Sequence, residues 1–358
     1  MNVKKICILV GARPNFVKVA PLIRAIEQSE DASYSLVYAG PENDSTIEPS
    51  LFDDLQMPRP DVYLGVDSLD LNGITAHVMS RFDHYLDTFA ADVVIVVDDL
   101  ASTMAAAIVA KKRGLQLAHL VAGTRSFDIK MPKEINRLVI DALSDYLFTA
   151  GIKSNSVATR EGGETAQTYM VGNILMDSLR ACHSRLRRPA VFDDLGLEDG
   201  HYLVLTMNRK ALLAERATLK QLVDVLLSTG LPIVAPLRGL ARKVMTELLG
   251  DAHTRLHLVD ALPYLEFGWL SAHALGVVTD SGNVAEEATF NGVPCITLNS
   301  YTEHIETVNE GTNVLVDGDA GKLRASLDQL MRGEWKHGSL PERWDGRTAE
   351  RIVRILVG

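Results

Sequence analysis

Two polar motifs each follow an apolar run and have the residue types that bind an anion. In Gly11-Ala12-Arg13-Pro14, the glycine permits a tight turn and Arg13 places a cation beside a predicted helix start. In Asp280-Ser281-Gly282-Asn283, small residues and free amides at a helix start can cradle a diphosphate. Glu287, a turn and a half later, is placed to accept hydrogen bonds from ribose hydroxyls. The first motif alone fits an anion site and an ordinary turn with a surface arginine equally well. The second motif favours a nucleotide ligand over a simple N-cap at Asp280 or Ser281.

Candidate acid–base groups occupy two further positions. Asp98 and Asp99 directly follow the apolar run Val93–Val97, where a carboxylate suits either a general base or a helix cap. A polar loop then leads into a helix that begins near Pro132. Arg125 and Arg137 in this segment are candidate clamps for phosphate or carboxylate. Glu134 lies in the first helical turn, where it would also complement the helix dipole.

Short β-branched runs alternate with amphipathic segments along the chain, which predicts parallel sheets with both faces covered by helices. The expected strands are Ile6–Val10, Tyr34–Tyr38, Val93–Val97, Leu117–Val121, Tyr146–Phe148, Thr168–Val171, His201–Thr206, Ile233–Pro236, Leu256–Val259, Leu275–Thr279 and Pro294–Leu298. The expected helices are Val17–Gln28, Gly73–Phe89, Ser102–Arg113, Lys133–Leu143, Ala211–Leu227, Arg242–Leu249, Pro263–Ala272, Val284–Asn291 and Arg347–Leu356. Ligands of such sheets bind beyond the C-terminal strand ends.

The alternation restarts near residue 201, so we predict two Rossmann-like domains. The basic, proline-containing stretch Ser184–Asp194 is the expected boundary, which gives domains 1–183 and 184–346. The final segment, 347–358, is expected to pack back on the first domain. The fold class is therefore α/β, with two Rossmann-like domains facing one another across a shared cleft.

Composition excludes several classes of protein. The chain has 358 residues, 47% of them hydrophobic and 23% charged, the balance of a folded globular protein. A net charge of −10 argues against nucleic-acid binding, and no apolar run is long enough to insert in a membrane. The three cysteines are odd in number and far apart, which predicts no disulfides and a reducing cytoplasm. The sequence predicts no cofactor and no metal site.

Several ordered motifs together resemble the non-hydrolysing UDP-N-acetylglucosamine 2-epimerase family, relatives of the GT-B glycosyltransferases. The motifs are GARPNFVKVAP from Gly11, RSFDIKMPKEINR from Arg125, VGNILMDSL from Val171, LPYLEFGW from Leu262, DSGNVAEE from Asp280 and ETVNEGTNV from Glu306. The family interconverts UDP-GlcNAc and UDP-ManNAc without a redox cofactor, by removing the C2 proton while UDP leaves C1. The resemblance implies a UDP-N-acetylhexosamine ligand in the cleft, a homodimer, and a role in surface-polysaccharide synthesis.

The resemblance also assigns roles to residues. It places Arg13, Ser281 and Gly282 at the diphosphate, Glu287 at the ribose, and Asp99 at a family catalytic carboxylate. We add Lys133 and Glu134 as candidate catalytic residues. The remaining candidate ligand contacts are Arg137, Asn208, Arg209, Arg238 and Asn283.

The chain departs from the family pattern at positions that matter for chemistry. Val121 and Lys133 stand where the family has carboxylates, and Asn208 stands where it has a histidine. Asn283 replaces the second glycine of the family's DSGG. Acid–base groups contribute about 10²–10⁴-fold each, so their loss predicts an impaired or rewired reaction. Three hypotheses follow: an epimerase or related isomerase or lyase with other acid–base groups, a UDP-sugar-binding pseudoenzyme or subunit, and a glycosyltransferase-like enzyme.

Overall fold

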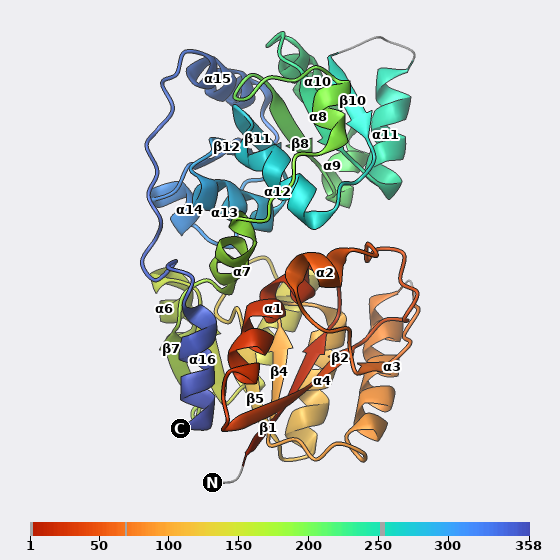
Figure 1. The fold of residues 1–358 in the computed structure, drawn as a ribbon, viewed down its shortest axis with the longest axis vertical. Coiled ribbons are helices and arrows are strands. Elements are labelled where there is room, and N and C mark those ends of the chain that lie inside the picture. Colours follow the sequence, from red (N-terminus) through yellow and green to blue (C-terminus); the bar gives the residue numbers. More distant parts are fainter. Residues whose placement is uncertain (1–2, 69, 251–254) are drawn as a thin grey trace. The chain divides into compact units, whose positions relative to one another are not determined.

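The computed structural model describes residues 3–68, 70–250 and 255–358, and the chain divides into two compact units (Figure 1). The first comprises Met1–Ala181 and Glu342–Gly358, and the second Cys182–Pro341. The predicted division at 183 and return at 347 lie within a few residues of these bounds.

The first unit contains a seven-stranded parallel sheet in the order β3-β2-β1-β4-β5-β6-β7. Its strands are β1 (Lys4–Val10), β2 (Ala32–Tyr38), β3 (Val62–Tyr63), β4 (Val93–Val97), β5 (Gln116–Leu120), β6 (Tyr146–Thr149) and β7 (Gln167–Met170). Its helices are α1 (Arg13–Glu27), α2 (Leu51–Leu55), α3 (Leu71–Tyr85), α4 (Ala101–Lys112), α5 (Pro132–Leu143), α6 (Ile152–Glu161), α7 (Ile174–His183, which continues into the second unit) and α16 (Thr348–Val357).

The second unit contains a six-stranded parallel sheet in the order β10-β9-β8-β11-β12-β13. Its strands are β8 (Leu203–Thr206), β9 (Ile233–Pro236), β10 (Leu256–Val259), β11 (Gly276–Thr279), β12 (Cys295–Thr297) and β13 (Asn313–Leu315). Its helices are α8 (Ala190–Asp194), α9 (Lys210–Ala214), α10 (Arg216–Leu227), α11 (Gly239–Leu249), α12 (Tyr264–Ala272), α13 (Gly282–Asn291), α14 (Glu306–Asn309) and α15 (Ala320–Met331).

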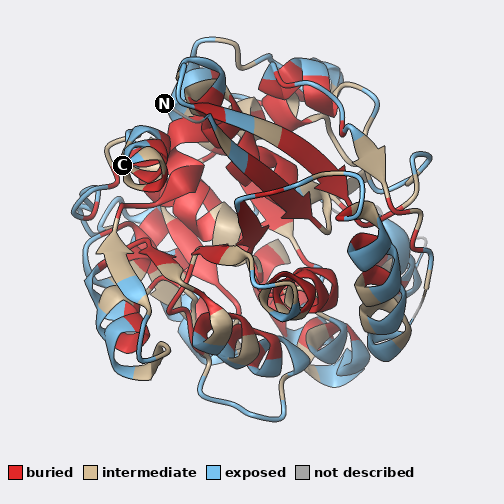
Figure 2. Ribbon diagram, turned by 90° about the horizontal axis from the view of Figure 1, so that it is seen from below, coloured by how far each residue is buried: buried red, intermediate tan, exposed pale blue. Residues whose placement is uncertain are grey.

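The central strands form the core because helices cover both faces of each sheet. Every residue of β4 is fully buried, and β1 is buried from Ile6 to Val10. Figure 2 shows these strands as buried ribbons, surrounded by helices whose outward faces are exposed. This double coverage explains why the strands read as continuous apolar runs.

Asp177 of α7 holds the C-terminal helix in the first unit. Its carboxylate accepts hydrogen bonds from the backbone N–H groups of Thr348 (3.2 Å) and Ala349 (2.8 Å), the first residues of α16. Burial raises the Asp177 pKa, although these backbone donors lower it in part. Helix α16 packs against α1. Residues at the two ends of the chain therefore build one unit.

Two of the differences between the structure and the sequence prediction concern helices. The expected linker Ser184–Asp194 contains α8, whose Phe192 is buried against the rings of Tyr202 and Trp269 in the second unit. The expected single helix Ala211–Leu227 is divided into α9 and α10, because Glu215 leaves the helical region with ψ at 74°. The break at Glu215 has no neighbouring proline or glycine that would predict it, whereas Pro189 directly precedes α8.

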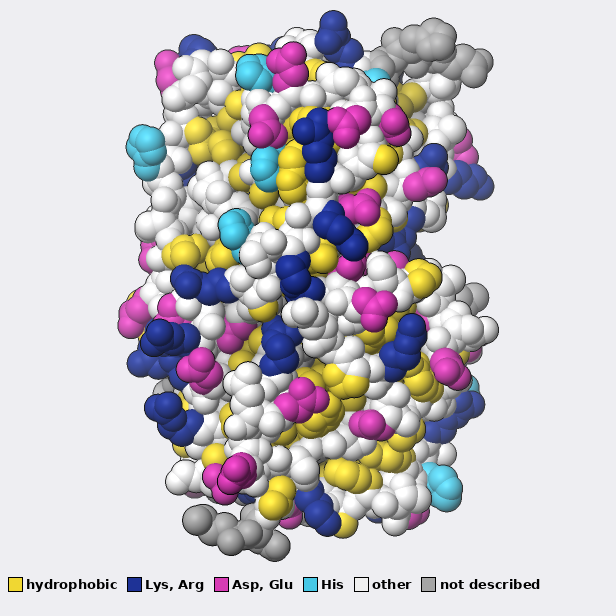
Figure 3. All heavy atoms as spheres, in the orientation of Figure 1, with side chains coloured by type: hydrophobic (Ala, Val, Ile, Leu, Met, Phe, Trp, Pro, Cys, Tyr) yellow, Lys and Arg dark blue, Asp and Glu magenta, His cyan; other side chains and the backbone are white. Residues whose placement is uncertain are grey.

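The three cysteines are free and buried, and no helix among residues 3–68, 70–250 and 255–358 is long and apolar enough to cross a bilayer. On the face drawn in Figure 3, lysine and arginine side chains are interspersed with acidic ones, without a basic stripe. In each unit the strand order reverses at one point, between β1 and β4 and between β8 and β11. Ligands of doubly wound sheets bind at such points.

Candidate functional site

In the first unit, Arg13 begins α1 directly after the turn that follows β1. Ala12 at the N-cap supplies no side-chain hydrogen bond, and Pro14 lacks an N–H, so the helix start is not closed by a side chain of its own. The Arg13 guanidinium is partly exposed and forms a bidentate ion pair with Glu48, with 2.6 Å between Nε and Oε2. The predicted diphosphate arginine thus already contacts a carboxylate.

Asp98 follows β4 and contacts two side chains of α1. Its carboxylate accepts from Asn15 Nδ2 at 2.8 Å and from Lys18 Nζ at 2.6 Å. Asp98 has a φ of 60°, and Val121, after the neighbouring strand β5, has a φ of 75°. Left-handed backbone is unusual for aspartate and strained for a β-branched valine, and such strain concentrates at functional sites. The expected alternative, an aspartate cap on α4, is wrong because the N-cap is Leu100.

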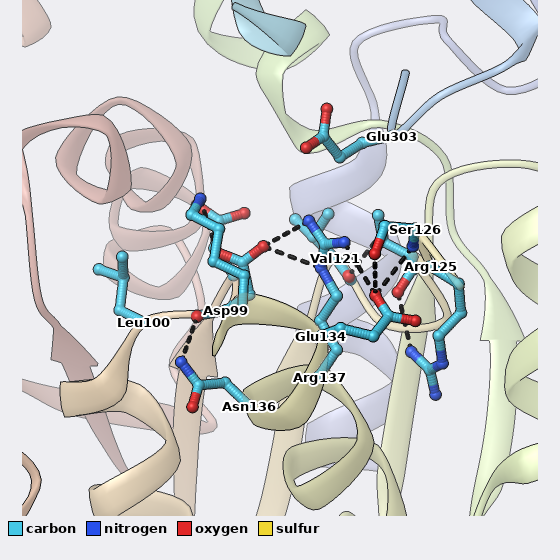
Figure 4. A network of polar contacts seen from close by, with 12 residues as sticks. Asp99, Leu100, Val121, Arg125, Ser126, Glu134, Asn136, Arg137 and Glu303 are labelled. Atoms are coloured by element: carbon cyan, nitrogen blue, oxygen red, sulfur yellow. Dashed lines mark hydrogen bonds and ion pairs between the residues drawn. The ribbon is translucent and has the colours of Figure 1, made fainter. Parts of the chain in front are cut away.

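Asp99 lies between two cations of α5. Lys133 Nζ is 3.0 Å from Oδ1, and Arg137 contacts Oδ2 through Nη2 at 2.6 Å and Nε at 2.8 Å (Figure 4). Burial raises the Asp99 pKa, but the charges of Lys133 and Arg137 outweigh burial and hold the pKa below its usual value. Asp99 is consequently a carboxylate of low basicity.

Glu134 anchors the loop that precedes α5. Its carboxylate accepts from the Ser126 N–H (2.8 Å), the Ser126 hydroxyl (2.9 Å) and the Phe127 N–H (3.1 Å), and Arg137 Nη1 lies 3.2 Å away. These donors hold its pKa below the usual value in spite of burial. Figure 4 shows Glu134 and Arg137 turned toward this loop and toward Asp99. Both candidate residues therefore form part of the framework around Asp99.

A buried ionic network lies under the strand ends. Asp141 of α5 contacts His119 Nδ1 at 2.5 Å and Arg125 Nη1 at 2.7 Å, and it accepts the Gly123 N–H at 3.1 Å. His119 Nε2 lies 2.8 Å from the Asp98 carbonyl oxygen. Both ring nitrogens of His119 therefore lie within hydrogen-bond distance of an oxygen atom. The side chains of His119, Arg125 and Asp141 are at most 2% exposed.

Arg125, predicted as a clamp for phosphate or carboxylate, holds carboxylates of the protein itself. Its side chain points into the core, where it contacts Asp141 and, through Nε at 3.0 Å, Glu161. Its guanidinium stabilises the fold and cannot reach a ligand. The sequence correctly placed Arg125 in a polar loop, but only the packed structure shows the direction of its side chain.

In the second unit, Asp280 joins two strand ends. Its carboxylate accepts the N–H groups of Asn208 and Arg209, each at 2.7 Å, so it links the loop after β8 to the end of β11. Arg209 donates back to the Asp280 carbonyl oxygen at 3.1 Å and to the Tyr301 hydroxyl at 2.8 Å. The alternative that Asp280 caps α13 is wrong, because Ser281 is the N-cap.

The start of α13 has no side-chain cap, and Ser281 instead donates its N–H to Thr279 Oγ1 at 2.9 Å. A carboxylate lies beside Gly282, because a Cβ built there would be 2.6 Å from Glu303 Oε2. Glu303 Oε1 is 3.8 Å from Arg209 Nη2. A carboxylate thus lies directly beside the expected diphosphate turn.

The other candidates differ in exposure. Asn208, Arg238 and Lys133 are exposed, Asn283 is half-buried, and Glu287 is buried within α13. The sequence motifs did not identify Lys18 or His119. Each is a charged or titratable residue in an otherwise apolar buried run, and such a residue could have marked a candidate site. Among the described residues, no group of three or more His, Cys, Asp or Glu side chains is arranged to hold a metal ion.

Comparison with known proteins decides the family. The family model described as UDP-N-acetylglucosamine 2-epimerase matches residues 24–357. The chain belongs to the UDP-N-acetylglucosamine 2-epimerase family. It is 31% identical to the UDP-N-acetylglucosamine 2-epimerase of Methanocaldococcus jannaschii, over 98% of both chains. It is 32% identical to the UDP-2,3-diacetamido-2,3-dideoxy-D-glucuronate 2-epimerase of Pseudomonas aeruginosa, over 98% of this chain and 99% of that protein.

Solved structures of this family share the fold. The M. jannaschii UDP-GlcNAc 2-epimerase in complex with UDP-GlcNAc and UDP aligns with a TM-score of 0.86 at 30% identity, covering 98% of this chain and 99% of that chain. The Neisseria meningitidis UDP-GlcNAc 2-epimerase aligns with a TM-score of 0.89 at 23% identity, covering 99% of both. The α/β fold of two parallel-sheet units is therefore of the GT-B type, as the sequence predicts.

Proposed function

We propose that this epimerase-family chain binds a UDP-N-acetylhexosamine and epimerises UDP-GlcNAc at C2 very slowly or not at all. The family membership and the relative solved with UDP-GlcNAc and UDP support the ligand class. We assign the diphosphate to Arg13 and to the Ser281–Gly282 turn, and the ribose to Glu287. Arg209, Arg238, Asn208 and Asn283 complete the proposed binding residues.

The environment of Asp99 is the observation that carries the second half of the proposal. Epimerisation needs a base whose pKa lies near the working pH and an acid on the opposite face of the sugar. Asp99 is ion-paired with both Lys133 and Arg137, and its pKa is lowered. Lys133 is committed to this carboxylate at 3.0 Å, and the Val121 side chain has no acid–base group. Asp99 suits a hydrogen bond to a sugar hydroxyl better than two proton transfers.

Solvent exchange tests this proposal directly. The protein is incubated with UDP-GlcNAc in D₂O, and NMR follows deuterium at C2 together with UDP-ManNAc, free ManNAc and UDP. We expect no C2 deuteration during a time in which an active family member would complete many turnovers. Rapid C2 exchange that Asp99→Asn abolishes would overturn the proposal and show a rewired acid–base set. Release of ManNAc or UDP would instead indicate a hydrolase or lyase, and sugar transfer to an added acceptor a glycosyltransferase.

A restored variant provides the positive control. The substitutions Val121→Glu, Lys133→Glu and Asn208→His return the family residue types at three positions. If the proposal holds, the triple variant should exchange the C2 proton faster than the wild-type protein, since each acid–base group contributes about 10²–10⁴-fold. Calorimetric titration with UDP establishes that wild type and variant both still bind the nucleotide.

We also propose a homodimer, with α5 at the interface. In α5, the charged side chains of Glu134, Arg137 and Asp141 are buried. The apolar side chains of Ile135 and Leu138 are instead 46% and 36% exposed, the reverse of the usual pattern in a surface helix. Apolar residues on the solvent side of a helix favour a partner surface. The three buried, free cysteines favour the cytoplasm, where we expect a role in surface-polysaccharide synthesis.

A further inference from the structure

Arg13 has a carboxylate partner in a loop that contributes no strand to the sheet. Glu48 lies in the loop between β2 and α2, outside any helix or strand. Its bidentate pair with Arg13 has the geometry with which a guanidinium binds a phosphate. The carboxylate therefore stands at the position that the proposed function gives to a phosphate group.

A second glutamate has the same relation to the other predicted phosphate position. Glu303 lies in the loop between β12 and α14, and its carboxylate occupies space beside Gly282 that a Cβ would fill. The positive end of the α13 dipole and the guanidinium of Arg209, 3.8 Å away, both favour a negative charge there. These are the same forces that would hold a ligand phosphate.

Two other carboxylates of the candidate site, Asp99 and Glu134, are more deeply buried than Glu48 and Glu303. Asp99 and Glu134 have side chains that are 9% and 4% exposed, and each accepts several donors from α5 or its preceding loop. The side chains of Glu48 and Glu303 are 15% and 21% exposed and extend from loops. Rotating a loop side chain into water costs less than breaking a buried pair.

We propose that Glu48 and Glu303 are internal competitors for the ligand's diphosphate, one in each unit. Each carboxylate neutralises a phosphate-binding cation or helix start in the free protein, and each must leave when the diphosphate arrives. The proposal rests on the proposed function, because it takes Arg13 and the Ser281–Gly282 turn as diphosphate sites. The affinity for the nucleotide then reflects how much more strongly these sites bind the ligand's diphosphate than the carboxylates of Glu48 and Glu303.

Replacing either glutamate by glutamine should therefore strengthen nucleotide binding. Glutamine keeps the size of the side chain but removes the charge that competes. For a partly exposed pair, we expect Glu48→Gln and Glu303→Gln each to tighten UDP binding by about two- to fivefold. Uridine, which has no phosphate, displaces neither carboxylate, so its affinity should stay unchanged in both variants.

Isothermal titration with UDP and with uridine tests the proposal on the full chain. Glu247→Gln is the matched control, because Glu247 pairs with Arg216 on the exposed surface of α11 and α10. Thermal denaturation of each variant establishes that it is folded. Tighter UDP binding in both glutamine variants, with uridine and Glu247→Gln unchanged, supports the proposal. Equal or weaker UDP binding than wild type overturns it while the proposed function stands. If neither wild type nor any variant binds UDP, both fall.

Discussion

Replacing Asp141 by asparagine should destabilise the first unit severely. The aspartate is fully buried, and its carboxylate pairs with His119 and Arg125 while accepting the Gly123 N–H. Asparagine keeps the shape and one acceptor but removes the buried negative charge that faces His119 and Arg125, and Arg125 then keeps only Glu161 as an ionic partner. Removing one partner of a buried ionic network typically costs about 3–5 kcal/mol, against a total stability of roughly 5–15 kcal/mol. We expect a loss in that range.

Tryptophan fluorescence can follow this unit separately from the other. Trp344 is buried in the first unit and donates to the Ala150 carbonyl oxygen, whereas Trp269 and Trp335 lie in the second. In a Trp269→Phe, Trp335→Phe background, urea unfolding therefore reports on the first unit alone. Separate reporters matter because a chain of two units need not unfold in a single step.

The pH dependence sharpens the test. The charges of His119 and Arg125 outweigh burial and hold the Asp141 pKa below its usual value. A lowered carboxyl pKa contributes stability above the unfolded pKa near 4, and this contribution disappears as pH falls through the folded pKa. The gap between wild type and Asp141→Asn should shrink in acid. A loss below about 1 kcal/mol at pH 7, no larger than for the exposed Asp224→Asn, would refute the reasoning.

Three further predictions concern the ligand, the C-terminal helix and assembly. Glu287→Ala should weaken UDP binding by about three- to tenfold through lost ribose hydrogen bonds, and calorimetry with identical affinities would remove Glu287 from the site. Asp177→Ala should destabilise the first unit by about 1–2 kcal/mol through loss of the α16 cap, as measured by urea unfolding. Because the Asp177 pKa is raised, Asp177→Asn should gain stability relative to wild type as pH rises through that pKa. Leu138→Glu should convert the proposed dimer to monomer in light scattering, whereas a monomeric wild type would contradict the interface.

The sequence alone determined the fold class and the family. Strands buried on both faces must be apolar along their whole length, so β4 and β9 have in the structure the same bounds as the apolar runs that predicted them. The turns after β1 and β11 are equally local, since glycine permits tight backbone turns that other residues resist. Short edge elements such as β3 and β13 were missed, because two or three residues carry no periodicity.

Only the tertiary structure decided which charged groups neutralise one another. Glu48 pairs with Arg13 and Asp141 with His119 across long stretches of chain, and no spacing rule connects such residues. The same holds for Asp99, which the sequence presented as a candidate catalytic carboxylate and which the fold places between Lys133 and Arg137. Ionisation depends on the distance to other charges in space, and that distance is fixed when helices pack on the sheet.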